Sequence, residues 1–127
     1  AEVLKKFDSD LNSPQQAESP EDLIKKKAEL TKKAEQGNTK AQFMLGMILI
    51  SGQGVRQDVA EAVKWFRKAA EQGSARAQVN MAILSIKGAG VQQDYAEAMK
   101  WYDKAIEQGH AKAQFNLGVM YAKGQGV

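Results

Sequence analysis

The sequence contains no cysteine and a single histidine, His110, among its 127 residues. Without cysteine the chain has no disulfide framework, thiolate metal site or thiol nucleophile, and its redox compartment stays open. An enzyme active site needs a nucleophile, a base and a group that orients the base within reach of one another. Because a single histidine lacks such partners, the sequence predicts a protein that is not an enzyme and uses no metal or other cofactor.

Long hydrophobic runs and blocks of one charge are absent as well. The longest apolar run, residues 43–50, is far shorter than the roughly 20 residues of a membrane-spanning helix, so we expect no membrane insertion. The net charge is only +3, and the lysines at 25–27 and 32–33 share their segment with four acids. That mixture favours a solvated face over a nucleic-acid contact. The chain starts at Ala1 without a signal-peptide pattern, which fits either a processed mature protein or a shortened chain.

An internal repeat dominates what is present. Aligning residues 37–72 with residues 73–108 gives 18 identities in 36 positions, among them Trp65 with Trp101. Unrelated segments would share about two residues. A third copy covers residues 109–127 and reaches only half of its length. The sequence therefore predicts two complete repeats and the first half of another.

Each unit is predicted to form two helices. The first spans residues 40–51 and is apolar almost all round, which is typical of an inner helix covered on several sides. The second spans residues 58–72 and has an apolar stripe opposite a charged face, as expected for an outer helix. Asp58 is expected to cap this helix, as Asp94 does in the next unit, and a left-handed Gly73 to end it.

Glycine pairs in the connections, Gly52 with Gly54 and Gly88 with Gly90, raise the alternative of a phosphate-binding loop. Such a loop would follow a strand and lead into a helix aimed at the phosphate. Because these glycines follow helices, helix termination is the favoured interpretation.

The residues before the repeats have a different character. A serine cap, a proline in the first turn and early acids at 19–22 indicate a helix start, and we expect a polar N-terminal capping helix over residues 20–36. Residues 1–19 are expected to form a weak helix followed by a loop.

The chain resembles Sel1-like repeats most clearly in two stretches, QDYAEAMKWYDKAIEQG at 93–109 and AQFNLGVMYAKGQGV at 113–127. The resemblance covers residues 37–127. It implies an all-α fold, a right-handed α/α superhelical solenoid of tetratricopeptide-like helix pairs, here preceded by the capping helix. One branch of the family has a cysteine pair in each unit, and this chain lies outside that branch.

The resemblance also implies a function. Family members are adaptors or scaffolds, often bacterial and often secreted or envelope-associated. The leading hypothesis is therefore a non-catalytic module that binds a protein or peptide through the concave face of the solenoid. A periplasmic or secreted location is favoured over a cytoplasmic one on the same ground. The alternative is a structural spacer segment of a larger solenoid, which further repeats joined to another domain would favour.

Candidate binding residues recur on the inner helices of successive repeats. They are Lys40, Arg76, Asn80, Lys112 and Asn116. By analogy with tetratricopeptide grooves, these cations and amides would hold an acidic peptide or a C-terminal carboxylate through charge-assisted hydrogen bonds. The alternative is that helix edges simply need polar residues, and the pattern is equally compatible with both.

Apolar residues fill two further slots of the inner helices, one turn apart. They are Phe43, Val79 and Phe115, followed by Met47, Ile83 and Val119. Core packing is favoured over a groove lining for these positions. Packing between units is likewise favoured over ligand contact for the two tryptophans, because they occupy equivalent outer-helix positions.

Two expectations concern the third unit. His110 occupies the slot of Asn38 and Ser74, which favours helix capping over catalysis or metal binding. The apolar helix expected at residues 111–123 has no outer helix after it within the sequence. Either further sequence or another molecule is expected to cover this open face, and self-association is expected if the chain is complete.

Overall fold

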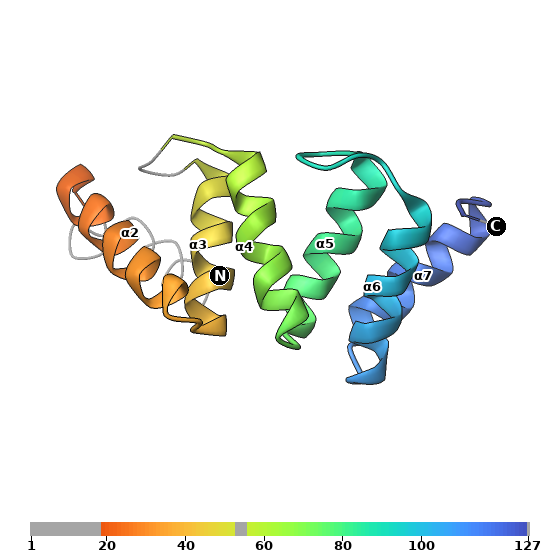
Figure 1. Ribbon diagram of the computed structural model, residues 1–127. Helices are drawn as coiled ribbons and strands as arrows, with labels where there is room; N and C mark the ends of the chain where they lie inside the picture. Colours follow the sequence, from red (N-terminus) through yellow and green to blue (C-terminus); the bar gives the residue numbers. More distant parts are fainter. Residues whose placement is uncertain (1–18, 53–55, 127) are drawn as a thin grey trace, which may run out of the picture.

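The computed structural model describes residues 19–52 and 56–126, and this part of the chain forms six helices and no strand. The helices are α2 (Pro20–Glu35), α3 (Thr39–Ser51), α4 (Val59–Glu71), α5 (Ala75–Lys87), α6 (Tyr95–Glu107) and α7 (Ala111–Ala122). Each packs on the next, from α2 at one end of the molecule to α7 at the other (Figure 1). The all-α repeat fold is as predicted. The weak helix expected near the N-terminus falls on residues 1–18, outside the described ranges.

Short side chains set where the helices begin. Asp58 and Asp94 accept hydrogen bonds from the backbone N–H groups of Glu61 and Glu97, both at 3.0 Å, so the outer helices α4 and α6 start at the predicted caps. The inner helices α3, α5 and α7 are capped in the same way by Asn38, Ser74 and His110. The capping role expected for the histidine is confirmed.

Glycines end the helices in the left-handed conformation, which other residues adopt only with strain. Gly52 and Gly88 directly follow α3 and α5 with φ of +70° and +67°. Their N–H groups donate to carbonyl groups inside the helices that they end. Helix termination, which was the favoured interpretation, therefore accounts for these two glycines.

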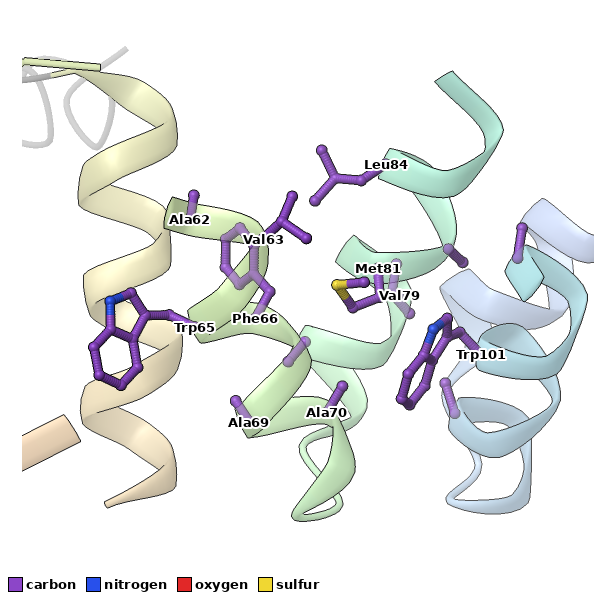
Figure 2. Packing of buried hydrophobic residues seen from close by; sticks show 14 of the residues in the cluster. Ala62, Val63, Trp65, Phe66, Ala69, Ala70, Val79, Met81, Leu84 and Trp101 are labelled. Atoms are coloured by element: carbon purple, nitrogen blue, oxygen red, sulfur yellow. The ribbon is translucent and has the colours of Figure 1, made fainter. Parts of the chain in front are cut away.

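Small residues let the two helices of a pair approach closely. An added Cβ at Gly46 of α3 would lie 2.7 Å from the ring of Phe66 on α4. Figure 2 shows Phe66 within the buried cluster, with Trp65 extending from α4 on the side of α3 and Trp101 from α6 on the side of α5. Both indoles are only 8% exposed, so the packing role predicted for them is confirmed.

Buried glutamines connect successive repeats. Gln42 of α3 donates from Nε2 to the carbonyl oxygen of Ala34 at the end of α2, at 3.1 Å. Its Oε1 accepts from Nε2 of Gln72 at the end of α4, at 2.7 Å. Gln78 makes the same two contacts one repeat later. Each of these amides therefore ties together the ends of two outer helices, which fixes how one pair sits on the next.

Candidate peptide-binding groove

The three inner helices share one surface. A pocket of about 190 Å³ is lined from α3 by Phe43 and Met47 and from α5 by Arg76, Val79 and Asn80. Lys112 of α7 and the cap residue His110 before that helix complete the lining. We call this pocket the central pocket. This single pocket therefore receives side chains from three successive inner helices. The inner helices are also where the candidate binding residues were predicted.

Arg76 is held in place by an aromatic ring from the preceding repeat. Its guanidinium Cζ lies 4.7 Å from the centroid of the Phe43 ring. A stacked guanidinium is attracted by the ring face and keeps its N–H groups available at its edge. Arg76 is therefore an oriented donor at the wall of the central pocket.

Two further pockets flank the central one, and they are equivalent under the repeat. The first junction pocket, of about 240 Å³, is lined by Met47, Ile50, Phe66, Asn80, Ile83, Leu84 and Lys87. The second junction pocket, of about 370 Å³, is lined by Ile83, Ile86, Tyr102, Asn116, Val119, Met120 and Lys123, together with Lys87, Lys112 and Gln125. The first seven residues of the second set follow the first set by 36 positions. Each junction pocket therefore combines apolar lining residues with an asparagine and a lysine.

The two asparagines differ in their partners. Asn80 Nδ2 contacts Met47 Sδ at 3.6 Å, which is a weak interaction. Asn116 instead shares a hydrogen bond with the buried hydroxyl of Tyr102. Burial raises the pKa of Tyr102, and the hydrogen bond with Asn116 opposes this rise. The side chain of Asn116 thus has a partner in the core, although the residue also lines the second junction pocket.

The structure brings most of the candidate residues together. Arg76, Asn80 and Lys112 line the central pocket, and Lys112 and Asn116 line the second junction pocket. Lys40 is exposed and lines none of these three pockets. Lys40 differs from Arg76 in its support. Arg76 rests on a ring from the preceding inner helix, whereas α3, which carries Lys40, is the first inner helix in the described part of the chain.

The apolar slots divide between core and groove. Val79 is 3% exposed and belongs to the core, as expected. Phe43 and Met47 line the central pocket, and Phe115 is 72% exposed on α7. Core packing was therefore the wrong expectation for Phe115 and for Met47, which is 42% exposed. The repeat period alone does not distinguish these positions, because exposure depends on which helices follow.

Sequence reasoning did not assign His110 to the groove. His110 was assigned only to capping, yet its ring also lines the central pocket between α5 and α7. The signal was present in its equivalence to Ser74, since both precede an inner helix that carries a cation two residues later. Within the described ranges, no cluster of three or more histidine, aspartate or glutamate side chains is arranged to hold a metal ion.

The repeats can be assigned to a family. The model of the Sel1 repeat matches residues 39–74, 75–110 and 111–127, which together run from α3 to α7. This chain belongs to the Sel1 repeat family. Sel1 repeat proteins are generally protein-interaction modules, and the family is generally non-catalytic. The matched repeats keep the 36-residue period and begin two residues later than the predicted boundaries.

Bacterial Sel1 repeat structures resemble this one. A protective antigen present in uropathogenic Escherichia coli strains is 46% identical, with a TM-score of 0.76 over 80% of this chain and 22% of the antigen. A Sel1 repeat protein from Oxalobacter formigenes is 35% identical, with a TM-score of 0.76 over 99% of this chain and 61% of that protein. Cysteine rich protein B of Helicobacter pylori shares the fold at 23% identity, with a TM-score of 0.70 over 81% of this chain and 74% of that protein.

This Sel1 repeat chain thus spans less than two thirds of the first two structures. No curated protein matches its sequence. None of the helices within residues 19–52 and 56–126 combines the length and hydrophobicity needed to cross a bilayer.

Proposed function

We propose that this chain is an adaptor or scaffold module that holds an extended segment of a partner protein in its inner-helix groove. The observation that carries the proposal is the recurrence of one junction pocket at two successive repeat boundaries. Contact with solvent alone does not require the same combination of apolar and polar lining residues at both boundaries. An extended segment, in contrast, offers side chains at regular intervals to equivalent pockets.

Charge gives the groove a preference. Arg76, Lys87, Lys112 and Lys123 line its three pockets, and none of the pocket-lining residues is acidic. A partner segment with acidic side chains would gain charge-assisted hydrogen bonds on this surface. The segment should also carry apolar side chains, because isoleucine, methionine and aromatic residues line the pockets.

A random peptide library displayed on phage tests the proposal. Panning on the wild-type chain should enrich peptides that mix acidic and apolar residues. An enriched peptide, labelled with a fluorophore, should bind Arg76→Glu/Lys112→Glu at least about tenfold more weakly, because each charge-assisted hydrogen bond contributes about 1.5–3 kcal/mol. Fluorescence anisotropy gives both dissociation constants.

The matched control is Lys64→Glu/Lys100→Glu. These two lysines occupy equivalent exposed positions on the outer helices α4 and α6, so the variant has the same net charge as the groove variant. It should bind the peptide like wild type. Equal losses in both double variants would reduce the effect to net charge. A failure to enrich any peptide would instead favour a spacer segment of a larger solenoid.

A further inference from the structure

The polar side chains that line the central pocket include two cations and no carboxylate. They are Arg76, Asn80, His110 and Lys112. Arg76 and Lys112 are each the second residue of an inner helix, α5 and α7 respectively. The positive ends of two helix dipoles therefore reinforce the side-chain charges on the same side of the groove.

His110 adds a donor whose direction is set by its capping bond. Its Nδ1 accepts a hydrogen bond from the backbone N–H of Ala113 at 3.4 Å. In the neutral ring the remaining proton must then lie on Nε2, which makes that nitrogen a donor. The cap thus fixes the tautomer of the neutral ring and leaves Nε2 free of the capping bond.

The central pocket also has apolar lining residues. They are Phe43, Met47 and Val79, and the Arg76 guanidinium lies over the Phe43 ring. The volume of about 190 Å³ is below the range of about 300–1,000 Å³ that is typical of drug-sized ligand sites. The pocket therefore has room for a single residue and not for a larger ligand.

We propose that the central pocket captures one carboxylate of the bound segment, with the apolar part of the same residue resting against its apolar lining residues. The proposal rests on the proposed peptide-binding function and names the chemistry at its centre. Arg76, His110 and Lys112 would donate to the carboxylate oxygens, and Asn80 would orient the neighbouring backbone. The carboxylate has two sources, the C-terminus of the partner or an aspartate or glutamate side chain, and both present the same planar pair of oxygens.

Three short probes separate the sources. The first is N-acetylated Ala-Ala-Ala-Leu with a free C-terminal carboxylate, the second is its C-terminal amide, and the third is the amide with glutamate in place of leucine. Each is titrated into the 15N-labelled chain, and amide shifts are followed on α3, α5 and α7. The free acid, the glutamate amide or both should shift the α5 and α7 N-termini and bind at least about tenfold tighter than the leucine amide. Equal affinity of all three probes would overturn the proposal.

His110→Asn tests the histidine without removing the cap. Asparagine already caps α3 through Asn38 at 2.8 Å, so the variant keeps a helix cap and loses only the ring donor. It should weaken the carboxylate probe by about threefold to tenfold at an unchanged melting temperature. Ser74→Asn makes the equivalent capping change at α5, where the cap lies outside the central pocket, and should leave affinity unchanged.

The outcomes separate this proposal from the broader one. If the probes shift residues of the junction pockets with no dependence on the carboxylate, peptide binding stands and the carboxylate site is wrong. If no probe shifts any inner-helix residue while phage panning also enriches nothing, both proposals are wrong. Unchanged carboxylate affinity in both His110→Asn and Lys112→Gln would place the carboxylate elsewhere and overturn the assignment.

Discussion

Tyr102 is a single residue that connects the hydrophobic core to the groove. It is 2% exposed, its hydroxyl bonds with Asn116, and burial raises its pKa. In the unfolded chain the Tyr102 hydroxyl ionises near its usual pKa of 10, which is below its raised pKa in the folded protein. Its contribution to the stability of the fold should therefore be fully present below pH 10. The stabilisation should then fall as the pH rises through the folded-state pKa.

Tyr102→Phe should remove this alkaline loss. Phenylalanine suits the site, because Phe66 occupies the equivalent position in the preceding repeat. Urea unfolding measured from pH 8 to pH 11 should show a smaller decline in the free energy of unfolding for the variant than for wild type. Tyr121→Phe is the control, because Tyr121 is 51% exposed and should keep the wild-type decline. An identical decline in all three proteins would contradict the assignment.

Trp101 is expected to stabilise the fold and not to contact a ligand. Its indole is 8% exposed, its Nε1 has no hydrogen-bond partner, and Lys104 lies 5.9 Å from the ring centroid. Trp101→Ala should therefore lower the free energy of unfolding by about 3–5 kcal/mol through lost packing. Lys104→Ala removes only the exposed cation and should cost at most about 1 kcal/mol. A Trp101→Ala variant that melts like wild type and fails to bind the selected peptide would reverse this reading.

At the scale of elements, equivalent positions on the inner helices have opposite environments. An added Cβ at Gly46 would meet the Phe66 ring at 2.7 Å, whereas one at Gly118 would meet nothing within 4 Å. Gly46→Ala should destabilise the chain, because the overpacking cost of about 1–3 kcal/mol exceeds the gain in helix propensity. Gly118→Ala should stabilise it by about 0.5–1 kcal/mol through that propensity alone. Thermal unfolding of both variants checks the sign, and two changes of the same sign would contradict this packing.

Helix positions were predictable because their signals are local. Asp58 with Glu61 and Asp94 with Glu97 mark starts in the sequence itself, and the observed helices begin and end within one residue of the predicted spans. Parts of the groove were not predictable in this way. The stacking of Arg76 on Phe43 joins residues 33 positions apart, and the bond between Tyr102 and Asn116 joins α6 to α7. Both depend on how helix pairs rotate on one another, which a repeat period does not specify.

At the scale of the whole molecule, each repeat is stabilised by its neighbours and the two ends differ. Gln42 and Gln78 each hold two outer helices, while Gln114 at the equivalent position of α7 is exposed. The opposite end carries α2, whose exposed face is rich in lysine and glutamate. The polar helix predicted over residues 20–36 corresponds to α2, and its role as an N-terminal cap stays a prediction.

The α7 end of the 127-residue polypeptide should promote self-association. Phe115 and Tyr121 are 72% and 51% exposed, whereas Leu49, the equivalent of Tyr121 in the first repeat, is 1% exposed. An uncovered aromatic surface of this kind favours contact with another molecule. Light scattering across a dilution series of the polypeptide should show an average mass that falls toward the monomer value as the protein is diluted.

Phe115→Ser should shift that transition to higher concentration by at least about tenfold, because burying a phenylalanine side chain contributes about 1.5–3 kcal/mol. Ile24→Ser is the matched control, since Ile24 is 60% exposed on α2 and its loss leaves the α7 face intact. A polypeptide that stays monomeric at every concentration, or an equal shift in both variants, would show that the α7 face does not mediate the contact.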